Sequence, residues 1–381
     1  MEKFSAYRDP GTGIQPFLNP VPPIGSDALA TVALPFGYAL AVIRTVLVVA
    51  LSLLYVVLVN GLCLVFLPVP PLYRLFTRIL TAVITRTILF IVGLFWIPVE
   101  IVTRKRGKGK HTTNSWNPSA GDIIVSNWVS WIEVLWLSYR FNPIFAVPVF
   151  DPPPSPAPAQ ASSPITHTPG RRTGTGSANI STAARAPLPR AQFRGFRVVS
   201  LLQMVMFSGR APPYGDGDPQ DQATSLENIR SKANAPIVVF PESTTSNGRG
   251  LLRLANVFPN LSVPIKDFNV FVMCVRYDPP TSITPSMAIP IPSSVMNPLG
   301  HVFRLSTSLV PLTISIRLLE PSDSPSSQLF IVSEIATDAA HDGLFTEVCA
   351  ALMAQLGKMK RTGMGWEEKA AFLEFYRSKK H

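Results

Sequence analysis

The chain has 381 residues and a formal net charge of +11, from 34 Lys and Arg against 23 Asp and Glu. Hydrophobic residues make up 47% and charged residues 15%, which excludes an intrinsically disordered chain, because disorder requires low hydrophobicity and high charge. Three cysteines are too few for a disulfide scaffold and suit a reducing compartment. The length allows one large domain or two small ones, and the positive charge suits either a nucleic acid or an anionic membrane surface.

The stretch 45–67 is the clearest indication of a membrane segment. No charged residue occurs between Arg44 and Arg74, and the stretch is long enough to cross a hydrocarbon core of about 30 Å as a helix, which takes roughly 20 apolar residues. It begins too far from the N-terminus for a signal peptide. A buried core helix is the competing interpretation, but such helices seldom run past about 20 residues without a charge. We therefore predict a transmembrane helix here, preceded by a cytosolic or flexible segment over 1–44.

A second apolar segment, 79–102, completes a membrane anchor predicted over 45–102. Arg86 and Glu100 interrupt this segment, and the prolines at 68–71 break any helix that would join it to the first. Two interpretations remain open: one true span followed by an interfacial helix, or a helical hairpin that enters one leaflet. We expect the endoplasmic reticulum or a lipid droplet as the location, because a hairpin can sit on the monolayer of a droplet whereas a full span cannot.

A basic run follows the anchor at once, in a juxtamembrane linker predicted over 103–119. It reads Arg104-Lys105-Arg106-Gly107-Lys108-Gly109-Lys110. Positive charge beside a membrane segment favours the anionic cytoplasmic leaflet and marks the cytoplasmic side. A solvated loop is the competing interpretation, but the position next to the anchor favours the membrane. Everything from residue 111 onward is then expected to face the cytosol.

Residues 120–381 are predicted to form an α/β domain. Apolar runs predict strands over 122–126, 236–240, 269–277 and 312–319, and helices over 130–139, 343–358 and 366–378. Strands separated by helices indicate a sheet with helices packed against it. Residues 151–190 interrupt the pattern. They hold many Pro, Ser, Thr and Ala residues, cannot bury a core, and are therefore predicted to be a disordered insertion.

Two loops that directly follow predicted strands carry most of the polar side chains. They read Ser126-Asn127-Trp128-Val129-Ser130-Trp131-Ile132-Glu133 and Phe240-Pro241-Glu242-Ser243-Thr244-Thr245-Ser246-Asn247-Gly248. Loops at the carboxyl ends of neighbouring strands build the sites of α/β sheets, so we expect the functional site here. The sequence has no phosphate-binding glycine loop and no Cys/His cluster with metal-ligand spacing, and it predicts neither a bound cofactor nor a metal. It also lacks interleaved basic and aromatic residues in this domain, which argues against a nucleic acid.

Both loops resemble motifs of the phospholipid/glycerol acyltransferase family, which includes the 1-acylglycerol-3-phosphate acyltransferases. The family carries Asn-His-x-Ser-x-x-Asp at the first loop, a middle block ending Phe-Ile/Val-x-Arg, and Phe-Pro-Glu-Gly-Thr-Arg-Ser at the second. The matching residues here are Asn127 and Ser130, then Phe207 and Arg210, then Phe240, Pro241, Glu242, Thr244 and Ser246, with Gly248 closing the last loop. The chain most resembles a divergent fungal branch linked to lysophosphatidate acylation and vacuolar protein sorting.

The chain departs from the family at the residues that carry the chemistry. The family His is the general base that takes the proton of the acceptor hydroxyl, and the Asp orients it. Trp128 and Glu133 stand at these positions, and an indole, which has one N–H donor and no acceptor, cannot be a base. Burial could raise the pKa of Glu133 enough for this side chain to serve as a substitute base. His301 and His341 rank behind Glu133, because nothing in the sequence places them near the site.

The third block departs as well, since Ser243 replaces its Gly and Thr245 replaces the Arg that follows its Thr. The loss of that arginine removes a phosphate contact. Arg210 and Arg249 remain as the candidates for that contact.

The resemblance implies a glycerophosphate acyltransferase-like α/β domain behind an N-terminal membrane helix or helical hairpin. The implied activity is transfer of an acyl group from acyl-CoA, the co-substrate, to a lysophospholipid, first of all lysophosphatidate, to give phosphatidate. The expected catalytic residues are Glu133, Ser130 and Asn127, and the expected substrate-binding residues are Arg210, Phe240, Pro241, Glu242, Thr244, Ser246, Gly248 and Arg249.

Three alternatives to this interpretation remain open, and the weakest is a basic membrane adaptor whose α/β domain only binds a protein partner. Without the family His, the chain could be a catalytically inactive relative that binds lysolipid or acyl-CoA and serves as a membrane scaffold or trafficking factor. The matched residues could also be structural: Ser130 and Glu133 form a Ser-x-x-Glu capping box, and Glu242 and Thr244 could satisfy local backbone groups.

Overall fold

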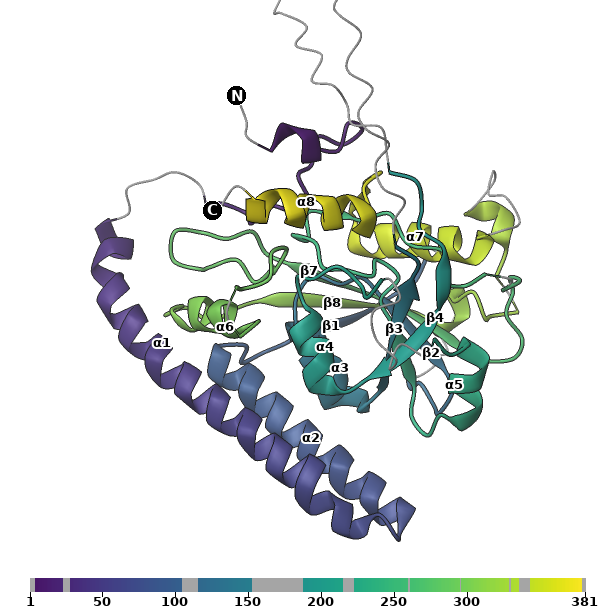
Figure 1. The fold of residues 1–381 in the computed structure, drawn as a ribbon, viewed down its shortest axis with the longest axis horizontal. Helices are drawn as coiled ribbons and strands as arrows, with labels where there is room; N and C mark the ends of the chain where they lie inside the picture. The colour runs from purple at the N-terminus through teal and green to yellow at the C-terminus, as the bar shows by residue number, and fades with distance from the viewer. Residues whose placement is uncertain are drawn as a thin grey trace, which may run out of the picture.

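The computed structural model describes residues 4–22, 28–104, 116–152, 188–214, 223–259, 261–294, 296–328, 330–335 and 343–378. Most of the expected disordered insertion, all of the basic run except Arg104, and His341 lie outside the described residues. The described residues form a mixed sheet with helices on both faces and a long helical hairpin beside it (Figure 1). The α/β class predicted from the sequence is thereby confirmed.

The sheet has seven strands in the order β1-β8-β7-β2-β5-β3-β4. They are β1 (Val99–Val102), β2 (Ile123–Ser126), β3 (Ile144–Phe150), β4 (Phe193–Val199), β5 (Ile237–Val239), β7 (Val270–Tyr277) and β8 (Ile314–Leu319). Strands β7, β2, β5 and β3 run parallel, whereas β8 and β4 are antiparallel to their neighbours β7 and β3. The parallel strands read as continuous apolar runs because helices cover both of their faces. This order brings the carboxyl ends of β2, β5 and β7 to one edge of the sheet.

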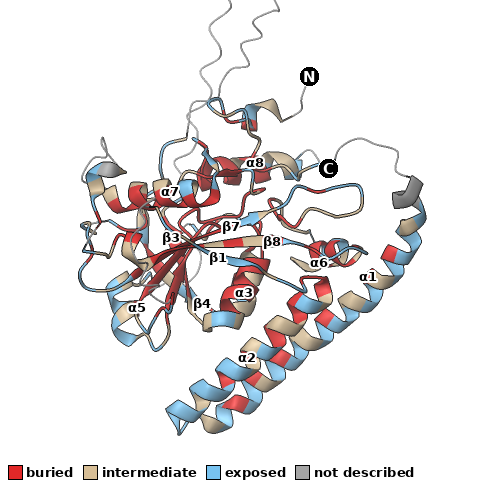
Figure 2. Cartoon of the chain, turned by 180° about the vertical axis from the view of Figure 1, so that it is seen from behind, coloured by how far each residue is buried: buried red, intermediate tan, exposed pale blue. Residues whose placement is uncertain are grey.

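The flanking helices divide between two apolar cores, one on each face of the sheet. The helices are α3 (Ile132–Phe141), α4 (Leu201–Phe207), α5 (Leu226–Lys232), α6 (Leu299–Ser306), α7 (Leu344–Gly357) and α8 (Trp366–Ser378), and a small second sheet pairs β6 (Gly250–Leu251) with β9 (Lys360–Arg361). Helices α3, α4 and α6 contribute to one core, and α5, α7 and α8 to the other. Figure 2 shows the buried residues concentrated in the sheet and on the helix faces that turn toward it.

Two apolar helices form the hairpin. They are α1 (Ala28–Tyr55), extended by a π-helical turn (Val56–Gly61) and a 3₁₀ turn (Leu62–Phe66), and α2 (Pro70–Val92). By length and composition alone, both are long and apolar enough to cross a membrane. Helix α1 buries a narrow seam that includes Ala41, Val48 and Tyr55 at seven-residue intervals, and most of its other large apolar side chains are exposed (Figure 2). An apolar surface of this extent suits contact with lipid.

The hairpin is attached to the domain at its base. Helix α2 packs along α3, and α1 crosses α6. At that crossing the Arg44 guanidinium donates to the carbonyls of Ser306 (3.2 Å) and Ser308 (2.7 Å). Gly37 permits the close approach, because a Cβ at this position would lie 2.8 Å from the carbonyl oxygen of Thr307.

The boundaries of the anchor differ from those expected. The second apolar segment, predicted over 79–102, divides in the structure: α2 begins at Pro70 and ends at Val92, and the last four residues are edge strand β1, which pairs in parallel with β8. Both an apolar edge strand and a membrane helix are hydrophobic, so hydropathy alone could not separate them.

The described part of the N-terminal segment belongs to the domain. Tyr7 and Phe17 are buried, and their rings lie 5.1 and 5.7 Å from the ring of Phe372 on α8. The Tyr7 hydroxyl also donates to the carbonyl of Ala371. Residues 4–18 therefore cover α8, although the sequence indicated only a cytosolic or flexible segment here.

Candidate functional site

The two loops singled out in the sequence meet at the carboxyl edge of the sheet, together with a third loop, 278–292, that follows β7. The Ser246 amide donates to the Trp128 carbonyl (3.1 Å), and the Ile289 amide donates to the Val129 carbonyl (3.0 Å). Each contact joins segments more than 100 residues apart, as expected for an α/β sheet that builds its site at the ends of parallel strands.

Glu133 is fully buried in the first turn of α3 and uses both carboxylate oxygens. Oε1 accepts hydrogen bonds from the amides of Val129 and Ser130, and Oε2 accepts one from the Tyr277 hydroxyl. Burial raises the pKa of Glu133 to about 7, and these hydrogen bonds oppose the rise. The carboxyl group therefore titrates near neutral pH, where a general base is effective.

A capping box has two hydrogen bonds, and Ser130 and Glu133 form one of them. The Glu133 carboxylate accepts the Ser130 amide at 2.6 Å, as in a capping box. The Ser130 hydroxyl, in contrast, is buried and has no hydrogen-bond partner among the described residues.

Glu242 lies behind the first loop and supports its backbone. The side chain is buried and accepts hydrogen bonds from the amides of Trp128 (2.6 Å) and Leu252 (2.8 Å). Burial, with a smaller contribution from the charge of Glu133, raises the pKa of Glu242 to about 8, and the two backbone hydrogen bonds and the charge of Lys369 oppose the rise. Because both oxygens bind backbone amides, Glu242 holds the loop in place and does not face a cavity.

A buried lysine lies where the family motif carries an arginine. The Lys369 ammonium, from α8, donates to the carbonyl (2.5 Å) and the hydroxyl (3.3 Å) of Thr245. Burial lowers the pKa of Lys369 well below its usual value, and the charge of Glu242 raises it. Thr245, the residue at the family's arginine position, is therefore contacted by a lysine from a helix 124 residues further along the chain.

Trp128 and Asn127 both point into the protein. The Trp128 indole is 2% exposed, stacks on the Phe240 ring at a centroid distance of 5.2 Å, and donates to the Ser130 carbonyl (3.0 Å). The Asn127 amide group donates to the carbonyl of Val275 (3.0 Å) and accepts from its N–H (2.7 Å). These contacts join β2 to β7 and leave neither side chain facing a cavity.

The other matched residues of the second loop shape its backbone. Pro241 is buried, the Thr244 hydroxyl donates to the Arg210 carbonyl (2.6 Å), and the Ser246 hydroxyl accepts the Gly248 amide (3.2 Å). The Ser246 contact is the kind of local backbone contact that a purely structural interpretation predicts, whereas the Thr244 contact joins this loop to a segment 34 residues away.

Ser243 shows why the family motif carries a glycine at its position. Its φ is 59°, in the left-handed region that glycine adopts without a steric cost. A serine here stores backbone strain of the order of 1 kcal/mol.

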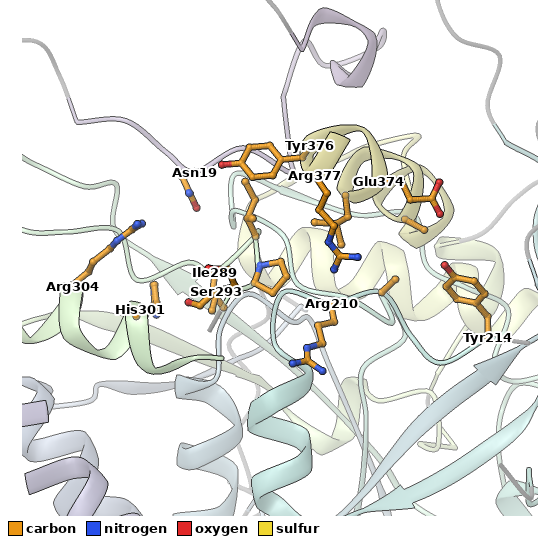
Figure 3. A pocket seen from close by; sticks show the side chains of 17 residues that line it. Asn19, Arg210, Tyr214, Ile289, Ser293, His301, Arg304, Glu374, Tyr376 and Arg377 are labelled. Atoms are coloured by element: carbon orange, nitrogen blue, oxygen red, sulfur yellow. The ribbon is translucent and has the colours of Figure 1, made fainter. Parts of the chain in front are cut away.

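A cavity of about 1060 Å³ opens beside these loops, between α6 and α8 (Figure 3). Arg210, Arg304 and Arg377 line it, and Glu374 is the only acid among the described lining residues. Figure 3 shows Arg377 extending from α8 toward Arg210, while Arg304 rises from α6. Because guanidinium groups bind phosphate through paired hydrogen bonds, this cavity suits a phosphate-bearing ligand.

A second cavity, of about 240 Å³, shares the loop 278–292 with the first. Arg249, Arg276 and Lys358 line it together with Tyr277. Arg210 and Arg249, the two sequence candidates for one phosphate contact, therefore line different cavities.

His301 lies in the wall of the larger cavity, although nothing in the sequence placed it there. Its Nδ1 accepts the indole N–H of Trp131 (3.0 Å), so Nε2 carries the proton and donates to the Ser286 carbonyl (3.1 Å). Burial lowers the pKa of His301 to about 4, which keeps the ring neutral. With both nitrogens occupied, His301 positions the loop of Ser286 and is not a free base.

Tyr277 and Lys369 are the site residues that sequence reasoning missed. A weak signal exists for Tyr277, which ends the apolar run predicted as a strand over 269–277. None exists for Lys369, which follows two acids on a helix and reads as a surface residue.

The chain is similar along its whole length to a curated yeast protein. It is 23% identical over 388 residues to the Schizosaccharomyces pombe protein named "Putative lysophosphatidic acid:oleoyl-CoA acyltransferase", and the alignment covers 100% of both chains. No protein-family profile and no solved structure matches the chain. The similarity supports an acyltransferase family, in agreement with the loop motifs.

Proposed function

We propose that this chain is an acyl-CoA-dependent O-acyltransferase that acylates a lysophospholipid, first of all lysophosphatidate, to give phosphatidate. The observation that carries the proposal is Glu133, a buried carboxyl with a pKa of about 7 at the position of the family Asp. The name of the similar yeast protein supports the same acceptor and the same class of donor.

The reaction requires a group that takes the proton of the acceptor hydroxyl while that oxygen attacks the thioester carbonyl. Glu133 has a suitable pKa for this task. A thioester is already activated, so positioning of the substrates and stabilisation of the developing negative charge supply much of the remaining rate.

The two cation-lined cavities suit the two substrates. Lysophosphatidate and CoA both carry phosphate, and arginines line both cavities beside the same loops. We assign Arg210 and Arg249 to separate phosphates, because they line separate cavities.

The hairpin suits a lipid substrate. Its exposed apolar side chains would anchor the chain in the membrane of the endoplasmic reticulum or on a lipid droplet, with the domain facing the cytosol. The domain would then take acyl-CoA from the cytosol and the lysolipid from the membrane.

Trp128 favours a second candidate function, that of an inactive relative that binds lysolipid or acyl-CoA as a membrane scaffold or trafficking factor. The indole is packed on Phe240 where the family places its base, so no histidine acts from this position. In this alternative the cation-lined cavities bind a ligand that is not converted.

A turnover assay on the purified, detergent-solubilised chain tests the proposal, with radiolabelled oleoyl-CoA and a panel of lysophospholipids. The wild type should form phosphatidate, and Glu133→Gln should lower kcat by about 10²-fold or more while lysolipid binding is retained. Glu347→Gln is the matched control, because Glu347 is an exposed acid on α7 that pairs with Arg361. A wild type that binds lysolipid without turnover would favour the inactive relative, and full turnover by Glu133→Gln would refute Glu133 as the base.

A further inference from the structure

Glu133 is enclosed, so a substrate hydroxyl cannot meet its carboxylate directly. The side chain has no exposed surface, and one oxygen accepts the amides of Val129 and Ser130. Displacing those amides would break the turn that begins α3. Among the described contacts of the carboxylate, only the hydrogen bond from the Tyr277 hydroxyl involves another side chain.

Tyr277 leads from Glu133 to the smaller cavity. It is the last residue of β7, its side chain packs against the core that contains α3, and it lines the cavity of about 240 Å³. Arg249, Arg276 and Lys358 line the same cavity and provide positive charge for a phosphate near the phenol.

We propose that Tyr277 is a catalytic residue of the acyltransferase reaction, and that its hydroxyl relays the proton of the lysophospholipid hydroxyl to Glu133. This inference rests on the proposed function and names the group that touches the acceptor. The acceptor hydroxyl lies against the phenol oxygen, and its phosphate lies among the cations of the smaller cavity.

The relay balances in protons and bonds. The acceptor O–H bond breaks as its proton moves to the Tyr277 oxygen, and the phenolic proton moves to Oε2 of Glu133. The acceptor oxygen attacks the thioester carbonyl, so that a C–O bond forms and the C–S bond breaks. The proton on Glu133 then returns through Tyr277 to the departing thiolate, which leaves as CoA-SH, and both side chains regain their starting states.

The surroundings keep the phenol in its neutral, donating form. Burial raises the pKa of Tyr277 well above its usual value, and the charge of Glu133 adds to the rise. A neutral phenol can donate to Glu133 while its oxygen accepts the substrate proton. The other charged groups around the pair are Glu242 and Lys369 behind the loop, and Arg249, Arg276, Asp278 and Lys358 around the cavity.

The direct test is Tyr277→Phe in the full chain, with oleoyl-CoA and lysophosphatidate as substrates. The relay predicts a fall in kcat of about 10²-fold or more with lysophosphatidate affinity within about twofold of wild type. The double variant with Glu133→Gln should be no slower than the slower single variant, because both groups act in one proton path. Tyr139→Phe on α3 is the matched control, since this tyrosine is partly buried in the same core and lines neither cavity.

A second variant covers the case in which Tyr277→Phe does not fold. Replacement of Tyr277 by 3,5-difluorotyrosine keeps the shape and the hydrogen bond but lowers the pKa of the phenol. The relay predicts a changed kcat and a shifted pH profile, whereas a structural hydrogen bond predicts neither. An active wild type whose rate is unchanged by both replacements would overturn the relay alone, and an inactive wild type would overturn the proposed function and the relay with it.

Discussion

Replacement of Lys369 by methionine removes a buried positive charge behind the site. Methionine keeps most of the volume of the lysine stem, so packing changes little, whereas the ammonium and its two contacts with Thr245 are lost. Glu242 also loses the positive charge that lowers its pKa. The variant therefore tests whether the cation from α8 stabilises the loop that follows β5.

The cost of this replacement should depend on pH. The pKa of Glu242 is raised from 4.5 to about 8 in the folded chain, so the protonated carboxyl favours folding at low pH, and that contribution is lost as the pH rises through 8. Without Lys369 the folded-state pKa rises further. At pH 9 the wild-type carboxyl is mostly ionised whereas the carboxyl of the variant keeps its proton, so the variant loses about 1 kcal/mol more than it does at low pH. At pH 6 the carboxyl is neutral, and only the contacts with Thr245 are lost, about 1–2 kcal/mol.

Urea unfolding of the detergent-solubilised chain at pH 6 and pH 9 measures this difference. We expect the loss in unfolding free energy to be larger at pH 9 than at pH 6 by about 1 kcal/mol. Lys232→Met, at an exposed position on α5, is the matched control and should change stability by less than about 0.5 kcal/mol at either pH. An equal loss at both pH values would show that Glu242 does not depend on the Lys369 charge and would refute the pair.

Ser243→Gly should raise the unfolding free energy by about 1 kcal/mol, because glycine adopts the left-handed φ of 59° without strain. An unchanged urea midpoint would mean that the hydrogen bond from the Ser243 hydroxyl to the Pro241 carbonyl offsets the strain. Arg249→Ala should weaken binding of phosphate-bearing lysolipids by about tenfold or more and of neutral lysolipids by less, because Arg249 lines the cavity beside Tyr277 and a charged hydrogen bond contributes about 1.5–3 kcal/mol. Equal weakening in a binding assay would show that Arg249 does not recognise the phosphate. Gly37→Val should separate α1 from α6, because the valine side chain would clash with the Thr307 carbonyl. Hydrogen exchange of the α6 amides should then become faster. Unchanged protection of these amides would contradict the packing described for this crossing.

Apolar runs predicted the central strands and the longest helices, since buried parallel strands such as β2 and β5 are hydrophobic on both faces. Strand β1 was assigned to the membrane anchor, because its exposed apolar side chains look like a membrane segment. Strand β3 was missed because Pro148 lies within it, and proline is a weak strand former. Short helices such as α4 and α5 have too few turns to show a period.

The meeting of the two loops was predictable from the rule that parallel strands end at one edge of a sheet. The partners of the carboxylates were not, because they come from distant parts of the chain: Tyr277 is 144 residues from Glu133, and Lys369 is 124 residues from Thr245. A single sequence carries no record of such pairings. Arg249 illustrates the same limit, since its place in the second cavity depends on how the loops fold over one another.

The buried ionisable groups also bear on the choice between an enzyme and an inactive relative. Glu133, Glu242 and Lys369 are all enclosed, and an apolar set of the same volume would often be as stable or more stable. Their contribution to stability is therefore a weak reason for their presence. Glu242 and Lys369 hold backbone in place, which any ligand-binding loop would use equally. Glu133 differs, because its second oxygen accepts a hydrogen bond from the Tyr277 hydroxyl at the wall of a cation-lined cavity. Support of the loop does not require this contact, whereas proton transfer does.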